Sequence, residues 1–122
     1  TRCSFRATLC LMSEPTIEIL EYLTTDGRNP FRDWLETLKD REARARIRVR
    51  INRVRLGNLG DCKSVGGGVS ELRIPHGPGY RVYFGRQGGT VVVLLCAGDK
   101  RTQVRDIEVA HAYWGDYLRR SG

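Results

Sequence analysis

Charged and aromatic residues alternate with apolar ones along the segment ELRIPHGPGYRVYF, which runs from Glu71 to Phe84. Such alternation is typical of strands, and HGPG at its centre supplies a turn, so we predict a β-hairpin. The polar face of this hairpin carries Glu71, Arg73, Arg81 and Tyr83. Two guanidinium groups on adjacent strands are suited to binding a phosphate. The alternative is an ordinary sheet face in contact with solvent.

A second basic cluster lies in GDKRTQ, residues 98–103, where an apolar strand ends and a helix begins. Backbone N–H groups at a helix N-terminus favour an anion, and Lys100 and Arg101 add positive charge. The glycine spacing differs from that of a P-loop. The QGG turn after the hairpin predicts that the next strand lies beside it, which brings the two basic clusters together.

Few residues are available for proton transfer. The two histidines are His76, in the hairpin turn, and His111, which we interpret as a packing or surface residue on the last helix. There is no identifiable Ser/His/Asp set and no metal-ligand spacing, so we predict no metal and no cofactor. Any catalysis then depends on acid–base and electrostatic work by Arg, Lys, His, Tyr or Asp.

The segment REARARIRVRINRVRL, residues 41–56, holds seven arginines and one glutamate, which accounts for a net charge of +6 out of +7 for the chain. Apolar residues alternate from Ala43 to Ile51, as in a strand. However, a helical stripe made of Ala43, Ile47, Ile51 and Val54 continues where the alternation fails. Arg and Ala favour helices, Asp40 provides an N-cap, and a glycine follows at Gly57. We therefore predict a helix, with Arg46, Arg50 and Arg53 available to RNA or to an acidic partner.

The remaining elements are predicted from hydrophobic periodicity and from residues that cap helices or form turns. Strands are predicted at residues 16–23, 69–75, 80–86 and 90–97, with a loop at residues 61–68. A helix is predicted from Pro30, with Asn29 as its cap and an apolar face made of Phe31, Trp34, Leu35 and Leu38. The last helix has Ile107, Ala110, Trp114 and Leu118 on its apolar face. The order β-α-α-β-β-β-α predicts an α+β domain with helices on a mainly antiparallel sheet.

Bulk properties fit one small basic domain. The chain has 122 residues, a net charge of +7 and a pI near 9.7, which suit an anionic partner. We interpret residues 1–12 as a leader or upstream segment and residues 13–120 as the domain. The four cysteines show no CxxC spacing and no apolar run reaches membrane-spanning length, so a reducing cytoplasm is expected.

The blocks ELRI…GYRVYF and GDKxTQxxDI, at this spacing, resemble the RelE/ParE toxin superfamily, in particular its HigB-like branch of phage-related addiction module killer proteins. The resemblance runs from about residue 17 to 117 and includes NPFRDWLETL. It implies a compact microbial-ribonuclease-like fold and a partner antitoxin, often of the helix-turn-helix DNA-binding type. In many members it also implies an endoribonuclease that cuts mRNA on the ribosome.

By this resemblance Arg81 matches the sheet arginine that we assign to the scissile phosphate, with support from Arg73. Lys100 or Arg101 matches the basic residue after the last strand. We assign Arg101, and Gln103 in the same block, to binding RNA or the ribosome. His76 and Tyr83 are candidates for proton transfer. The chain lacks the C-terminal tyrosine of the best-known ribosome-dependent members and has Asp106, either a base or a residue that orients the helix start.

The resemblance leaves other functions open. A ParE-like toxin poisons DNA gyrase without cutting RNA, and a degenerate domain only binds its antitoxin.

Overall fold

The computed structural model describes residues 16–121, so the expected leader at residues 1–12 lies outside the described part. The elements are β1 (Glu18–Glu21), α2 (Pro30–Thr37), α3 (Arg41–Arg55), β2 (Cys62–Ser64), β3 (Val69–Ile74), β4 (Tyr80–Gln87), β5 (Val91–Asp99), the 3₁₀ turn η1 (Lys100–Thr102) and α4 (Gln103–Ser121). This is the α+β domain that the sequence predicts.

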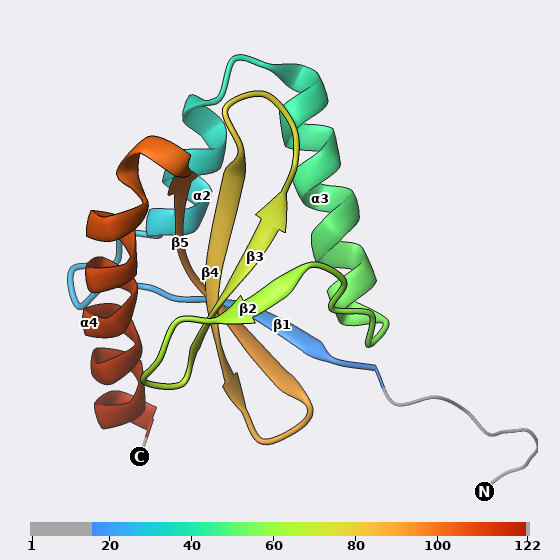
Figure 1. Cartoon of the computed structure of the whole chain (residues 1–122). Helices are drawn as coiled ribbons and strands as arrows, with labels where there is room; N and C mark the ends of the chain where they lie inside the picture. The colour runs from blue at the N-terminus through green and yellow to red at the C-terminus, as the bar shows by residue number, and fades with distance from the viewer. Residues whose placement is uncertain (1–15, 122) are drawn as a thin grey trace, which may run out of the picture.

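The five strands form one sheet in the order β1-β5-β4-β3-β2. All neighbours are antiparallel except β1 and β5, which run parallel. β5 lies between two strands and is buried along residues 92–98, as its continuous apolar run predicts. Helices α2 and α3 lie on one face of the sheet and α4 on the other, so the domain has three layers (Figure 1).

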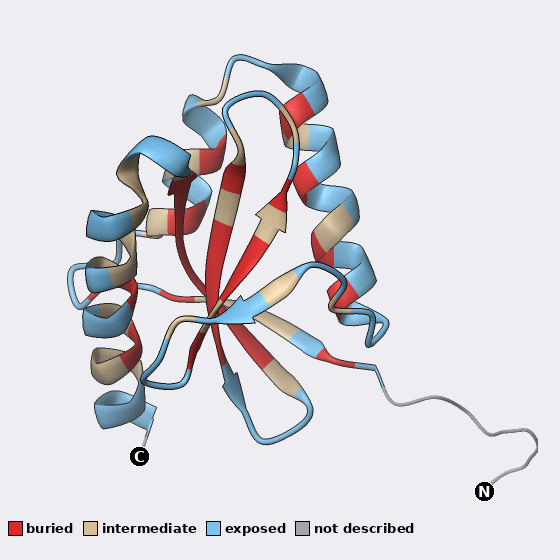
Figure 2. Cartoon of the chain, viewed as in Figure 1, coloured by how far each residue is buried: buried red, intermediate tan, exposed pale blue. Residues whose placement is uncertain are grey.

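Local sequence explains the helix pair. Asn29 caps α2 by accepting a hydrogen bond from the Arg32 N–H, with Pro30 at the first helical position. Asp40 caps α3 by accepting from the N–H groups of Glu42 and Ala43. The predicted stripe of α3, Ala43, Ile47, Ile51 and Val54, is buried against the sheet (Figure 2), which confirms the helical interpretation of the arginine-rich segment.

The sheet face that carries Glu71 and Tyr83 is not the ordinary solvent-exposed face that was the alternative interpretation, because both side chains are buried. α4 covers it and builds a second apolar cluster from Val69, Val93, Leu95, Ala110 and Trp114, among others. Trp114 lies so close to β4 that a Cβ on Gly85 would come within 2.4 Å of its ring. Of the predicted apolar face of α4, Ala110 and Trp114 are buried and Ile107 is half-buried. Leu118, the last residue of that predicted face, is 43% exposed.

Two strands differ from the prediction. Residues 61–68, expected to be a loop, contain β2, whose three residues pair with the edge of β3. CKS has no strand-like alternation, so its conformation follows from pairing rather than from its own pattern. β1 is shorter than the predicted residues 16–23, although Tyr22 still donates its N–H to the Leu94 carbonyl.

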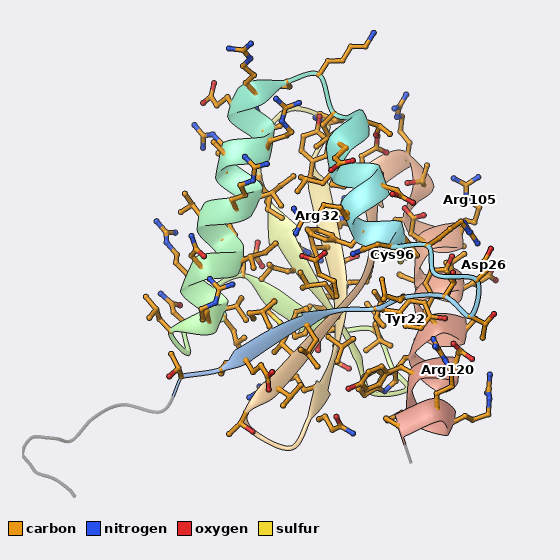
Figure 3. All side chains as sticks on the ribbon, turned by 180° about the vertical axis from the view of Figure 1, so that it is seen from behind. Tyr22, Asp26, Arg32, Cys96, Arg105 and Arg120 are labelled. Carbon is orange, nitrogen blue, oxygen red and sulfur yellow. The ribbon has the colours of Figure 1, made fainter. Side chains whose placement is uncertain are left out.

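Side-chain contacts connect the C-terminal end of β1 to α4. The Tyr22 hydroxyl donates to the Asp116 carboxylate over 2.6 Å, and the Tyr22 ring stacks on Tyr113. The Arg120 guanidinium lies over the same ring, 5.5 Å from its centre (Figure 3). The first strand and the last helix are therefore held together on the α4 face.

Candidate functional site: a buried carboxylate with two arginines

The register of the β3–β4 hairpin places its polar residues in two facing pairs. Arg73 lies opposite Arg81, and Glu71 lies opposite Tyr83. The prediction that the two arginines are neighbours is confirmed. β5 pairs with β4 so that Gly98 faces Arg81, which brings the start of GDKRTQ beside the hairpin as expected.

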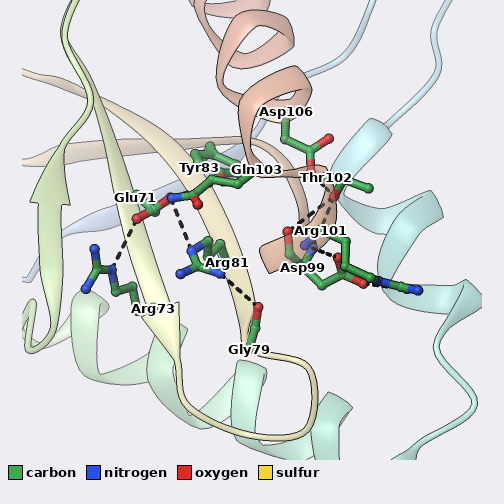
Figure 4. Close-up of polar contacts among 10 residues, drawn as sticks. All are labelled: Glu71, Arg73, Gly79, Arg81, Tyr83, Asp99, Arg101, Thr102, Gln103 and Asp106. Atoms are coloured by element: carbon green, nitrogen blue, oxygen red, sulfur yellow. Dashed lines mark hydrogen bonds and ion pairs between the residues drawn. The ribbon is translucent and has the colours of Figure 1, made fainter.

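Glu71 is the centre of this cluster (Figure 4). Its carboxylate is fully buried and accepts hydrogen bonds from Gln103 Nε2 at 2.7 Å, Tyr83 Oη at 3.1 Å and Arg73 Nε at 3.2 Å. The Nε of Arg81 lies 3.4 Å from Glu71 Oε2. Burial opposes the charge, but the hydrogen bonds and the arginine outweigh it, so the pKa of Glu71 lies below its ordinary value. The site thus contains an ionised carboxylate that organises its cations.

Arg81 is positioned from two sides. Its Nη1 donates to the Gly79 carbonyl at 3.2 Å, and its Nε faces Glu71. The side chain is only 13% exposed, whereas that of Arg73 is 37% exposed. A Cβ built on Gly79 would lie 3.7 Å from Arg81 Nη1 and 3.9 Å from Lys100 Cβ, so the stem of Lys100 borders the same place. Arg81 therefore lies beside the hairpin turn, with Arg73 across from it on β3 and the Cβ of Lys100 close to Gly79.

The candidates for proton transfer lie in different surroundings. Tyr83 is fully buried, and burial together with the charge of Glu71 raises the pKa of its hydroxyl far above the ordinary value. It therefore serves as a donor that holds Glu71. His76 is half-buried in the hairpin turn, where its Nε2 lies 3.0 Å from Asp40 Oδ2, at the start of α3.

Asp106 lies at the junction of β5 and α4. Its carboxylate accepts from the Thr102 hydroxyl and packs on the backbone of Gly98, where a Cβ would approach Asp106 Oδ2 to 1.9 Å. The thiol of Cys96 donates to the Asp106 carbonyl at 3.6 Å; burial, and then the charge of Asp106, raises its pKa to about 12. These contacts give Asp106 a structural part at the helix start.

The other predicted RNA contacts divide between two places. Arg101 is exposed and pairs with Asp99 at 3.0 Å, next to the site. Gln103 is bound to Glu71 inside the cluster. Arg46, Arg50 and Arg53 lie on α3, across the sheet from α4 (Figure 1), and so are separate from the Glu71 cluster.

The residue that sequence reasoning missed is Glu71. It alternates with apolar residues like any solvent-facing strand residue, and its complete burial results from the position of α4. The available signal was its position on the same strand face as Arg73, across from Tyr83 and diagonal to Arg81 in a tight hairpin, since a buried charge needs such partners.

Sequence comparison places the chain among known proteins. The sequence model of the family described as phage-derived protein Gp49-like (DUF891) matches residues 33–112, which include α3, the whole hairpin, β5 and the start of α4. The chain belongs to the Gp49-like family. A relative from Haemophilus influenzae, described as an uncharacterized protein, is 50% identical over 95 residues, covering 78% of this chain and 90% of that protein.

The family match contains all the residues that surround Glu71 in this Gp49-like protein.

Among the helices described here, none is long and apolar enough to cross a bilayer. Within residues 16–121, no three His, Cys, Asp or Glu side chains gather as a metal ion would require.

Proposed function

We propose that this Gp49-like protein is the toxin of a type II toxin–antitoxin module and cleaves mRNA on the ribosome as a metal-independent endoribonuclease. Its partner is then a cognate antitoxin, expected to be a helix-turn-helix DNA-binding protein. The observation that carries the proposal is the Arg81–Arg73 pair, preorganised by a buried carboxylate and bordered by Lys100. Family membership and the resemblance to HigB-like toxins support it.

The proposed reaction is an in-line displacement at phosphorus. The RNA 2′-oxygen bonds to the adjacent phosphorus and the bond to the 5′-oxygen breaks. A base takes the 2′-hydroxyl proton, and a water molecule gives a proton to the departing 5′-oxygen. Arg81 offsets the negative charge that builds on the phosphoryl oxygens, and Arg73 and Lys100 hold the flanking phosphates. Fixed donors act strongly because they need no reorganisation during the reaction.

The candidates for proton transfer differ in burial and in the hydrogen bonds that already occupy them. Tyr83 is sealed from solvent and Asp106 is engaged at the helix start. His76 lies in the turn that also carries Gly79, the carbonyl partner of Arg81, and its Nε2 has Asp40 as an orienting carboxylate. We therefore assign the base that takes the 2′-hydroxyl proton to His76.

The test uses purified protein, ribosomes and a defined mRNA, with new 5′ ends mapped by primer extension. Wild type is expected to produce discrete ends. Arg81→Ala is expected to lower the cleavage rate about 100-fold or more, the usual cost of removing one transition-state donor. Arg105→Ala removes the same charge from an exposed position on α4 and is expected to cleave normally.

Arg81 also offsets the charge of Glu71, so each variant needs a thermal unfolding curve. Arg81→Lys keeps the positive charge but loses the guanidinium fork and is expected to fold and cleave slowly. Intact mRNA with folded wild-type protein would overturn the proposal.

The burial of Arg81 also favours a competing function, in which the domain is catalytically degenerate and only binds its antitoxin. In that case cells expressing wild type and Arg81→Ala grow equally well without antitoxin. Growth arrest by wild type alone contradicts it.

A further inference from the structure

A groove with a volume of about 450 Å³ lies on the α3 side of the sheet, away from the Glu71 cluster. Its lining is Glu42, Ala45, Arg46, Val49, Arg50 and Arg53 from α3, with Ile74 and Pro75 from the end of β3. These α3 positions recur every three or four residues, so they form one helical stripe beside the buried one. From residue 42 to residue 53 this stripe spans about 16 Å, or three helical turns.

The floor of the groove is apolar and open. Ala45 leaves the hollow because its side chain is a single methyl group, and Val49 is 48% exposed. Ile74 and Pro75 continue the apolar lining across to the sheet. An exposed valine on an otherwise arginine-rich helix gains from being covered by another apolar surface.

The walls of the groove are basic. Three arginines against Glu42 give it a net charge of +2. Arg50 is fixed, since its Nη2 donates to the carbonyls of Leu59 at 3.0 Å and Asp61 at 3.2 Å. Arg46 pairs with Glu42 at 2.8 Å in an exposed ion pair that an incoming carboxylate can replace. An occupant must therefore present apolar groups to the floor and negative charge to the walls.

These features favour a protein segment over RNA. Single-stranded RNA is usually bound by stacking its bases on aromatic side chains or on guanidinium planes. No aromatic side chain lines this groove, and the guanidinium groups of Arg46 and Arg50 are already engaged with Glu42 and with backbone carbonyls. An amphipathic helix with apolar residues on one side and acidic residues along both borders matches the floor and the walls together.

We propose that the groove between α3 and the end of β3 binds an acidic amphipathic helix of a partner protein. The helix places aliphatic side chains over Ala45 and Val49 and carboxylates beside Arg46 and Arg53. This binding goes beyond RNA cleavage and does not depend on it, because the Glu71 cluster lies on the other face of the sheet.

The test measures fluorescence anisotropy with a labelled helical peptide of about 18 residues, long enough to form a helix. The peptide carries Leu at i, i+3, i+4 and i+7 and Glu at the flanking positions. Two matched peptides replace every Glu with Lys or every Leu with Ser. The first peptide is expected to bind the full-length protein at least about tenfold more tightly than either control peptide.

Matched variants locate the binding. Arg46→Glu is expected to lower the affinity for the peptide about tenfold. Arg48→Glu, the same change on the α2 side of α3, is expected to have little effect. Val49→Ser is also expected to lower the affinity for the peptide. Leu56→Ser, which changes an exposed apolar residue outside the groove, is the control and is expected to leave the affinity unchanged.

Three outcomes would overturn the proposal: no binding of the acidic peptide, equal loss with Arg46→Glu and Arg48→Glu, or displacement of the peptide by a single-stranded RNA whose own binding needs Val49. Because the readout is peptide binding, none of them bears on RNA cleavage.

Discussion

Glu71 shows how a single buried charge can organise a cationic site. An uncompensated carboxylate in an apolar layer is very costly, yet this one has partners on three strands or helices: Arg73 on β3, Tyr83 and Arg81 on β4, and Gln103 on α4. In return it fixes the two guanidinium groups at one end of the hairpin. At the residue scale, the same contacts therefore serve both stability and the site.

Glu71→Gln should reveal this dependence through pH. The pKa of Glu71 is lowered by folding, so its charge stabilises the native state above its ordinary pKa, and this contribution disappears as the pH falls through the lowered value. We expect Glu71→Gln to lose about 3 kcal/mol of unfolding free energy at pH 7, and the difference from wild type to shrink below pH 4.5.

Urea unfolding at several pH values measures this difference. Glu42→Gln breaks the exposed pair with Arg46 and serves as the control, with a much smaller expected effect. A constant gap between Glu71→Gln and wild type from pH 7 to pH 3 would contradict the argument.

At the element scale, α4 determines which hairpin side chains are buried and how Glu71 is held. It covers the polar face of the sheet, donates Gln103 to Glu71 and inserts Trp114 against β4. The close approach of this helix to the sheet depends on glycine in β4, because any side chain there meets the indole.

Gly85→Ala tests this packing. The added methyl group would lie 2.4 Å from the Trp114 ring, so α4 must shift outward. We expect a loss of about 2 kcal/mol of stability, typical of overpacking, and weaker RNA cleavage because Gln103 moves with the helix. Gly89→Ala, in the β4–β5 turn with no atom within 4 Å, is the matched control. Equal melting temperatures for the two variants would show that Trp114 repacks easily.

The elements themselves were predictable where local patterns are strong. Asn29 with Pro30, and Asp40 with the stripe beginning at Ala43, indicated both helices correctly, and alternation indicated β3 and β4. β2 was missed because three polar or small residues carry no strand signal.

The candidate site was only partly predictable. The pairing of Arg73 with Arg81 follows from a tight hairpin, which sequence reveals. The burial of Glu71 and Tyr83 depends on which face of the sheet α4 covers, and that is settled by the connection from β5 through η1 rather than by the hairpin residues.

At the scale of the whole molecule, charge is distributed unevenly. Residues 41–56 hold most of the net charge of +7, on the layer opposite the Glu71 cluster. This distribution creates a general attraction for polyanions that is distinct from binding at Arg81, because it acts at long range and is screened by salt.

We therefore expect RNA affinity to fall steeply with salt, with log K decreasing by about 0.7 per phosphate contacted for each unit of log salt concentration. Filter binding between about 50 and 200 mM salt measures this slope. Arg46→Gln and Arg48→Gln are expected to lower RNA affinity equally, because the general attraction does not depend on position. A larger effect of either one would indicate a specific RNA contact on α3.

The parallel pairing of β1 with β5 has a consequence for the order in which the domain assembles. Residues 18–21 pair with residues 91–94, and the hydrogen bonds to the Glu71 carboxylate are complete only when Gln103 is in place. In a chain emerging from the ribosome, the sheet therefore cannot close until residues 91–94 are available, since such distant contacts form late. For a protein proposed to attack translation, this topology delays activity until residues 91–103 have left the ribosome that makes them.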